Sequence, residues 1–438
     1  MENRDLELGG MENMIEERVD LFLDRVKEEH NLNEKITPSI HMAPRTLRYL
    51  ISPWSFQPRV VSIGPLHRDD ENVQAFERQK ATYVTNLMNS CMDDHITSSP
   101  KIIMNSCMEK VYASMKKIKA CYVLKKIYND VEFAEMMVMD ACFILGFIYE
   151  TFENNSPDMF HADDVVEDLV LLENQIPFFF LEEIFECTIA KLMPNTSLVV
   201  FMYPLLLILN IFNSDLDLNI LKNISIDDTH HILSLLHECY KPLKNDTILK
   251  EFSITKPHSA VDLDKAGVSF KPNRSPTWVL GMEMEFPCFL WSWCNCTLRM
   301  PVFLVKDLTE VTLRNLIAYE QESRQTRNYI TSYAFVISML VNTQDDVAKL
   351  VDSEVLVNVM GSNGEVANMI NNICKEVAMV NSLYDQQWKT LDKYYDSYWP
   401  NMRRTYFSSP WNIINLIVGS IIFALTIVQT IFTIRAVK

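Results

Sequence analysis

The residues best suited to chemistry are three histidines and a cysteine within the stretch DDTHHILSLLHECY. They are His230, His231, His237 and Cys239. Histidine and cysteine bind zinc, and in HExxH-type sites two histidines four residues apart on a helix face one ion. His230 and His237 are about two helical turns apart, which is too far for a single ion. The cluster therefore predicts the start of a helix capped by Asp227 rather than a metal site.

A second candidate is a group of three cysteines, Cys288, Cys294 and Cys296. Thiolates in a C-x-C spacing can bind zinc, but a structural zinc site needs four ligands. No fourth cysteine lies nearby, and the nearest histidine is His258. We therefore expect buried thiols on strands. Ten irregularly spaced cysteines in 438 residues likewise predict a reduced, cytosol-facing body rather than a disulfide framework.

A group of acidic residues could supply a carboxylate pair for general acid–base catalysis. Its members are Asp163, Asp164, Glu167, Asp168 and Glu173. Asp164 and Asp168 share one helix face, because they are four residues apart. However, Asp163 or Asp164 can cap a helix, and acidic side chains in a first turn stabilise the helix dipole. We therefore favour the interpretation that these acidic residues begin a helix, and the sequence makes no case for catalytic residues.

Glycine is scarce, with nine residues in the whole chain. Phosphate-binding loops, dinucleotide-binding turns and nucleophile elbows all need glycine where the backbone approaches a ligand or takes a positive φ. No G-x-G-x-x-G, G-x-x-x-x-G-K-[ST] or G-x-S-x-G sequence occurs. We therefore expect no cofactor and no enzymatic activity.

The formal net charge of −17 bears on the partners of this protein. Nucleic-acid backbones and anionic lipid surfaces are bound by clustered lysine and arginine. The acidic balance therefore excludes nucleic acid as an expected partner and argues against a polybasic grip on lipid.

Hydrophobic periodicity predicts a mainly α protein with a small β-hairpin element and one C-terminal transmembrane helix. Residues 1–35 form an acidic extension, and residues 36–404 form a large helical body that begins with a proline-rich extended segment. Strand-like patterns occur only at about 265–305, separated by proline and asparagine turn signals. Residues 405–438 form the membrane anchor.

The anchor depends on an uncharged apolar run whose span is about 411–434. A helix of this length extends about 36 Å, enough to cross a hydrocarbon core of about 30 Å. Pro410 suits a first helical turn, and Trp411 and Tyr406 suit an aromatic belt. The basic flanks are Arg403, Arg404, Arg435 and Lys438. The polar residues inside, which could bond within the helix or to a partner helix, are Asn412, Asn415, Ser420, Thr426, Gln429 and Thr430.

A rival apolar run, Leu198 to Phe212, is too short for a span and carries Pro204 in its middle, so it predicts a buried core helix. The N-terminus has no apolar core typical of a signal peptide. These features predict a single-pass, tail-anchored protein, most simply at the plasma membrane with its body in the cytosol. Its partners are then the lipid bilayer and an unidentified protein or peptide.

Several blocks together resemble one plant family, the "domain of unknown function 247" proteins. They begin at PRTLRYLISPWSFQPRVVSIGPLHR and continue through KATYVTNLM, MVMDACFIL, LLENQIPFFFLEEIF, HSAVDLDKAGVSFK, TLRMPVFLV, NLIAYEQ, ITSYAFVISMLVNTQDDVAKLV and YFSSPWNIINLIVGSIIFALTIVQTIF. The blocks span roughly residues 36–434 in family order. One departure is Gly146, where the family commonly has a glutamate.

The resemblance implies a helical body with a C-terminal membrane helix, and it implies no established catalytic residues. Some resembling grass proteins are associated with pollen–stigma self-incompatibility. Within the motif LENQIP, we expect Glu173, Asn174 and Gln175 to hold the backbone around Pro177, because amides both donate and accept hydrogen bonds. Pro410 and Trp411 belong to the corresponding motif at the anchor.

Two hypotheses about function follow. The first is a membrane-anchored interaction or recognition protein. The alternative is an uncharacterised enzyme at the membrane surface, with a hydrolase as the least strained choice, and it requires histidines and carboxylates to converge in a pocket.

Overall fold

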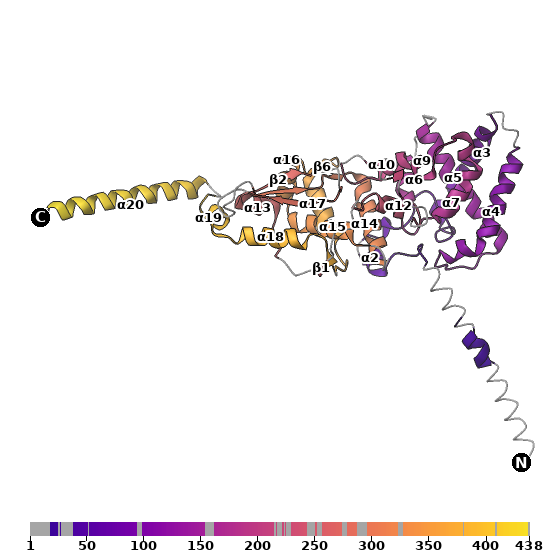
Figure 1. The fold of residues 1–438 in the computed structure, drawn as a ribbon, viewed down its shortest axis with the longest axis horizontal. Helices are drawn as coiled ribbons and strands as arrows, with labels where there is room; N and C mark the ends of the chain where they lie inside the picture. Colours follow the sequence, from indigo (N-terminus) through magenta and orange to yellow (C-terminus); the bar gives the residue numbers. More distant parts are fainter. Residues whose placement is uncertain are drawn as a thin grey trace, which may run out of the picture.

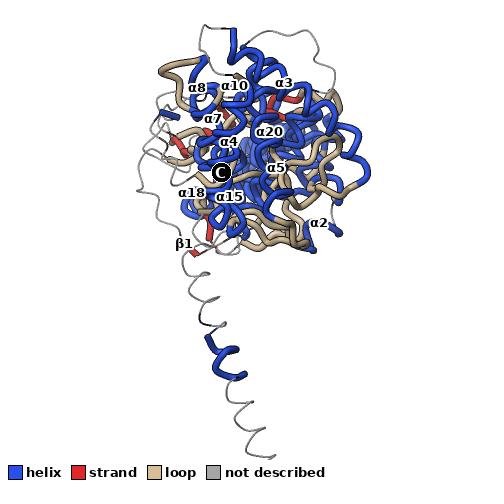
Figure 2. Tube along the Cα trace, turned by 90° about the vertical axis from the view of Figure 1, so that its right-hand side faces the viewer, coloured by secondary structure: helices blue, strands red, loops and turns tan. Residues whose placement is uncertain are grey.

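The computed structural model describes residues 18–24, 27, 38–50, 52–93, 99–153, 162–213, 216, 221–222, 224, 229–242, 250–251, 256–273, 278–286, 296–322, 327–379, 381–407 and 410–436. Figure 1 shows an elongated helical body, with the N-terminal helices at one end and a long C-terminal helix projecting from the other. Viewed from the end, the body is dominated by helices, with a few short strands (Figure 2). The expected mainly α class is confirmed.

The helices of the N-terminal half are α2 (Arg45–Leu50), η1 (Pro53–Ser55), η2 (Glu71–Phe76), α3 (Glu77–Asp93), α4 (Pro100–Ala120), α5 (Asp130–Ile148), η3 (Tyr149–Glu153), α6 (Ala162–Leu169), α7 (Phe178–Cys187), α8 (Ile189–Leu192), α9 (Leu198–Phe201) and α10 (Tyr203–Leu209). Those that follow are α12 (Ile232–Glu238), α13 (Ala260–Ala266), α14 (Asp307–Glu322), α15 (Tyr329–Leu340), α16 (Gln344–Asp352), α17 (Asn363–Ile373), α18 (Asp385–Tyr395), α19 (Tyr398–Tyr406) and α20 (Pro410–Ala436).

Helix α5 is the centre of the N-terminal half. Its side chains are apolar almost all round from Phe133 to Ile148, and nearly all of them are buried, as expected for a helix surrounded by others. It packs against α3, α4 and α7. Its start is fixed by Asn129, whose side-chain oxygen accepts a hydrogen bond from the Glu132 N–H at 2.8 Å. The core of the N-terminal half is therefore packed around this helix.

Gly146 lies where α5 passes closest to α3. A Cβ built on Gly146 would lie 2.9 Å from the main-chain oxygen of Tyr83, closer than real Cβ atoms approach a backbone oxygen. A larger side chain, such as the glutamate that the resemblance implies at this position, therefore does not fit the helix packing of this chain.

Replacing Gly146 with alanine is expected to destabilise the body by about 1–3 kcal/mol, because the added methyl group must push α3 and α5 apart. The matched control is Gly364→Ala in the first turn of α17, where the nearest non-neighbouring atom to an added Cβ lies 3.7 Å away. That control is expected to be neutral or slightly stabilising. Thermal unfolding of the two variants beside the parent chain tests this, and equal midpoints for both would contradict it.

The expected β element lies where the sequence placed it, but its topology is not a simple hairpin. Strand β4 (Cys296–Met300) lies in the middle, parallel to β2 (Val268–Pro272) and antiparallel to β3 (Glu283–Glu285). β4 ends at Met300, directly before Pro301, which has no N–H for a ladder. After Pro301, β5 (Phe303–Val305) pairs in parallel with β6 (Leu356–Asn358). A two-stranded ladder joins β1 (Lys250–Glu251) to β7 (Asn381–Ser382).

The rival apolar run at 198–212 is part of the core. It forms two short helices, α9 and α10, with Pro204 at the start of the second. The proline explains the break, because it fits a first helical turn and disrupts a helix interior. Among the residues that the structure describes, only Trp411–Arg435 in α20 is long and apolar enough to cross a membrane.

Candidate functional site

The proline-rich segment at residues 58–67, hereafter the extended segment, runs through the interior without helix or strand. Its backbone N–H groups must therefore be satisfied by side chains. Asp168, on α6, accepts three of them: Oδ1 bonds the Arg59 N–H, and Oδ2 bonds the N–H groups of Val60 and Val61, each at 2.8 Å. One carboxylate thus replaces the ladder that a neighbouring strand would supply.

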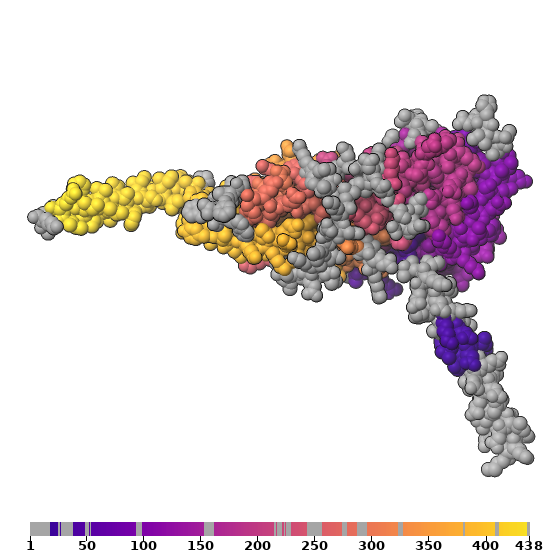
Figure 3. Space-filling view, viewed as in Figure 1, coloured from indigo at the N-terminus to yellow at the C-terminus, as the bar shows by residue number. Residues whose placement is uncertain are grey.

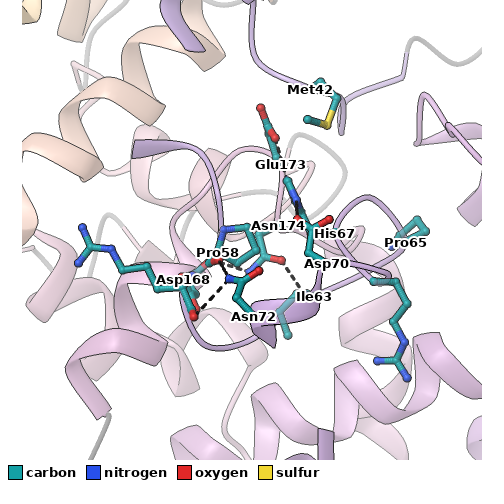
Figure 4. Close-up of polar contacts among 12 residues, drawn as sticks. Met42, Pro58, Ile63, Pro65, His67, Asp70, Asn72, Asp168, Glu173 and Asn174 are labelled. Carbon is teal, nitrogen blue, oxygen red and sulfur yellow. Dashed lines mark hydrogen bonds and ion pairs between the residues drawn. The ribbon is translucent and has the colours of Figure 1, made fainter. Parts of the chain in front are cut away.

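The motif LENQIP continues this support (Figure 4). The side-chain oxygen of Asn174 accepts from the Ile63 N–H at 2.6 Å, and its amide group donates to the main-chain oxygens of Val61 and Asp168. Gln175 donates to the main-chain oxygens of Leu169 and Leu171, each at 2.8 Å. Pro177 precedes α7 as its N-cap residue. Asn174 thus contacts backbone more than one hundred residues away. Gln175 donates within its own turn, and its side-chain oxygen accepts from the Leu233 N–H, 58 residues away, at 3.4 Å.

Glu173 is fully buried and joins three segments. Its Oε1 accepts from the Ala43 N–H at 2.9 Å, and its Oε2 lies 2.8 Å from His67 Nε2 and 3.5 Å from the Arg48 guanidinium. The other nitrogen of His67 lies 2.7 Å from a carboxylate oxygen of Asp70. Both ring nitrogens of His67 therefore face carboxylates, which leaves neither free to exchange a proton with a substrate. Together with Asp168 and Asn174, Glu173 and His67 form a buried set of polar contacts that holds the extended segment in place, hereafter the brace.

A buried ion pair supports the same segment from α3 and α5. Lys80 Nζ lies 2.6 Å from Asp140 Oδ1, and the other oxygen of Asp140 accepts from the Gly64 N–H at 2.8 Å. Lys80 also donates to the Ser62 main-chain oxygen and lies 2.8 Å from Glu77. Burial raises the pKa of Asp140, and the Lys80 charge opposes that rise. Gly64 has a φ of +70°, and a Cβ there would lie 2.8 Å from the Gln175 main-chain oxygen.

Sequence reasoning missed Lys80, Asp140 and His67. One signal for Asp140 was available, since it is the single charge in the apolar run MVMDACFIL. A lone charge in such a run requires a buried partner. The identity of that partner, 60 residues earlier, is not encoded locally.

The clustered histidines do not converge on one point. His230 is exposed, and His231 is the N-cap of α12, where its ring accepts from the Ser234 N–H at 3.2 Å. The expected cap at Asp227 is wrong, because the helix begins at Ile232; Asp227 itself lies outside the described residues. His237 Nε2 lies 2.8 Å from Glu320, whose carboxylate also accepts the N–H groups that open α15.

The acidic group is also dispersed. Asp163 is exposed and Asp164 half-buried in the first turn of α6, inside the helix rather than at its cap. Glu167 pairs with Arg59 at 2.8 Å, at the surface. Asp168 is buried one turn after Asp164, and its oxygens are occupied by backbone. Asp164 and Asp168 therefore do not form a carboxylate pair around a substrate.

Cys239 and Cys296 are buried, and burial raises the pKa of each thiol to about 12. Such thiols stay protonated near neutral pH and are poor metal ligands and nucleophiles. Cys288 and Cys294 lie outside the described residues. Within the described part of the chain, no group of three or more histidine, cysteine, aspartate or glutamate side chains could hold a metal ion.

The residues that the sequence predicts as a membrane anchor lie at the far end of the molecule (Figure 1). Pro410 is the first residue of α20, Trp411 is 73% exposed, and Arg435 lies in the last turn. Arg403 and Arg404 lie in the last turn of α19, and the Arg404 guanidinium lies 3.5 Å from the ring centre of Tyr395. Lys438 lies outside the described residues. The window that makes α20 apolar has a mean hydropathy of 2.2, and none of it is buried by the body (Figure 3).

The structure is thus that of a mainly α protein with an extended segment held by buried acid and amide side chains. Its apolar C-terminal helix lies outside the body. The chain belongs to the family DUF247, described as a plant protein of unknown function, whose model matches residues 40–425. It is similar to UPF0481 protein At3g47200 of Arabidopsis thaliana, with 23% identity over 87% of this chain and 83% of the relative. It is also similar to the putative UPF0481 protein At3g02645 of Arabidopsis thaliana, with 22% identity over 93% of this chain and 92% of the relative. No solved structure matches the chain.

Proposed function

We propose that this protein is a single-pass membrane protein whose helical body binds a protein or peptide partner beside the bilayer. The observation that carries the first part is the exposure of α20: its apolar side chains touch almost nothing of the body. Each large apolar side chain moved out of water contributes about 1.5–3 kcal/mol. A bilayer is the environment that removes all of them from water at once.

The body is proposed to lie in the cytosol, at the plasma membrane. The described cysteines are free thiols, and all but Cys374 are buried. Reduced thiols in this number are typical of a reducing compartment.

The described polar constellations favour binding over catalysis. A hydrolase would need a histidine with a free ring nitrogen and a carboxylate facing an open cleft. His67, His237 and His258 each pair with a carboxylate at separate places, and all three are buried rather than facing an open cleft. Our proposal is therefore that the buried contacts of Asp168, Glu173 and His67 hold the body together rather than perform a reaction.

A candidate partner surface lies over α14 and α17. A depression of about 400 Å³ there is lined by Ser52, Glu310, Arg314, Met360, Glu365, Asn368, Met369, Asn372 and Lys375. Trp54, two residues after Ser52, is 70% exposed. The Arg314 guanidinium lies 2.8 Å from Glu310. Of these, Arg314 is only 5% exposed, so the exposed Trp54 is the stronger candidate, since tryptophan is among the residues that most often dominate binding energy at protein interfaces.

Disrupting α20 is expected to release the protein from membranes. The variant Ile421→Arg/Leu425→Arg places two charges near the middle of the helix, at a cost of about 5–7 kcal/mol for insertion. We expect the parent chain to resist extraction by alkaline carbonate from plant membranes, and this variant to become extractable. Ile421→Leu/Leu425→Ile is the matched control and should behave as the parent.

A parent chain found in the soluble fraction would refute the anchor. On sealed cytosol-side-out vesicles, added protease is expected to digest the body. A protected and glycosylated body would instead place it on the opposite side of the membrane.

Replacing Trp54 with alanine is expected to weaken partner binding about thirtyfold, or about 2 kcal/mol, because truncation of an interface tryptophan removes a large contact. Full-length tagged protein would be cross-linked in plant membranes, and partner recovery would be compared between variants by quantitative mass spectrometry. Ile127→Ala is the control, since Ile127 is 97% exposed at another place on the body. Equal partner recovery from both variants would exclude this surface.

A further inference from the structure

The polar side chains of α20 are confined largely to one side of the helix. Steps of four and three residues from Asn415 keep to a single face, as in a heptad repeat. This face, hereafter the polar seam, consists of Asn412, Asn415, Gly419, Ile422, Thr426, Gln429 and Thr433. Only Ile422 among these is a large apolar residue.

The opposite face is mainly apolar: Ser420 is its one polar residue within the apolar run, and Arg435 follows on it in the last turn. At about 100° per residue it centres on Ala424 and includes Ile413, Ile417, Val428 and Ile431. Ser420 lies away from the seam, and its hydroxyl donates to the Leu416 main-chain oxygen of its own helix at 2.8 Å. The helix thus has one side suited to lipid and one side that is not.

The threonine hydroxyls of the seam form hydrogen bonds within their own helix, but two of its side-chain amides do not. Thr426 and Thr433 donate to main-chain oxygens one turn earlier, each at 2.8 Å. The side chains of Asn415 and Gln429 have no hydrogen bond to any described residue. An amide with no partner in hydrocarbon is costly, because no water is present to replace the missing bond.

The seam is also uncovered and open. A Cβ added to Gly419 would meet nothing within 4 Å, and the body buries none of the apolar window. A hollow of about 520 Å³ lies at the start of the seam, with Thr405, Asn412, Asn415 and Gly419 among its lining residues. Figures 1 and 3 show α20 projecting from the body, and only its start contacts α19, where Asn412 donates to the Thr405 main-chain oxygen at 3.1 Å. A second helix can therefore reach this face.

We propose that two copies of this protein pair in the membrane through parallel α20 helices that meet along the polar seam. This inference rests on the proposed membrane anchor. Copies of one single-pass chain insert in the same direction, so each seam residue faces its own counterpart at the same depth. Asparagine and glutamine both donate and accept, so Asn415 and Gln429 can each pair with themselves.

Two further features fit a second copy. The seam carries no charge, so identical faces do not repel. Gly419 lets the helix backbones approach closely, as small residues do at membrane helix interfaces. A repeat of 3.5 residues is the spacing of left-handed helix pairs, which cross at about 20°.

Cysteine cross-linking of the full-length chain in membranes tests the pairing. Ile422→Cys places a thiol on the seam, and Ala424→Cys places one on the opposite face. Under oxidation with copper phenanthroline, Ile422→Cys is expected to give disulfide-linked dimers above the background of the parent chain, whereas Ala424→Cys is not. Alkaline carbonate extraction of the same samples shows whether the chain is anchored.

Variants of the seam then test its chemistry. Adding Asn415→Leu/Gln429→Leu to the Ile422→Cys chain is expected to lower the dimer yield roughly fivefold or more. Gly419→Leu should also lower it, whereas the matched controls Ser420→Leu and Ala424→Leu should not.

Equal cross-linking from positions 422 and 424 in an anchored chain would overturn the pairing and leave the anchor intact. Cross-links from position 422 to a different protein would overturn the second copy as the occupant. An extractable chain would overturn both proposals.

Discussion

Replacing Asp140 with leucine is expected to destabilise the body by about 3 kcal/mol, because it leaves the Lys80 ammonium buried without its main partner. Lys80 and Asp140 are both 0% exposed and lie 2.6 Å apart. The Gly64 N–H also loses its acceptor. Removing one partner of a buried ion pair costs about 3–5 kcal/mol of stability. We expect a value at the lower end of this range, because Glu77 still contacts Lys80. Urea denaturation followed by tryptophan fluorescence measures the change.

The matched control is the double variant Lys80→Met/Asp140→Leu, which removes both charges. Replacing a whole buried ion pair by apolar side chains is often neutral or stabilising. We therefore expect the double variant to recover most of the lost stability. A double variant as unstable as Asp140→Leu alone would show that packing, rather than the unpaired charge, determines the loss.

Acidification is expected to unfold the body in part through His231. Burial lowers the pKa of His231 from an ordinary value of 6.5 to about 3. Between these values the unfolded chain binds a proton that the folded chain does not, so the free energy of unfolding falls as pH falls from about 6.5 to about 3. Above pH 6.5 the neutral His231 makes its full contribution to the free energy of unfolding. That contribution is roughly 4 to 5 kcal/mol, at 1.36 kcal/mol per pKa unit.

His231→Asn tests this expectation, because asparagine retains the ability to cap α12 but does not titrate in this range. Thermal midpoints measured from pH 7.5 to pH 4 should fall less steeply for this variant than for the parent. The exposed neighbour offers the control, since His230→Asn should leave the pH profile nearly unchanged. Parallel profiles for His231→Asn and the parent would refute the assignment.

The apolar C-terminal helix could be predicted from sequence because its signal is local. An uncharged apolar run needs no distant partner to form a helix, and α20 spans Pro410–Ala436 against an expected span of about 411–434. The buried placement of residues 198–212 was equally local, since the run is too short and carries Pro204. Pattern reasoning failed by a few residues at α12, where His231 rather than Asp227 is the cap.

The brace could not be predicted, because its contacts join residues far apart in sequence. Glu173, Asn174 and Gln175 were expected to hold the backbone around Pro177. The structure places the side chain of Asn174 against Ile63 and that of Glu173 against Ala43 and His67. No periodicity or spacing records such pairings. A charge inside an apolar run indicates that a partner exists, without indicating where.

The brace has a consequence for synthesis of the chain on the ribosome. Val61 is synthesised 107 residues before Asp168, which accepts the hydrogen bond of its N–H. The Asn315 amide, which donates to the Ser55 main-chain oxygen, is synthesised 260 residues after Ser55. At about 5–20 residues per second, the extended segment remains without its acceptors for roughly 5 to 20 seconds. During that interval a proline-rich apolar stretch is exposed on the nascent chain. Productive folding of this protein is therefore expected to depend on chaperone protection of its first hundred residues.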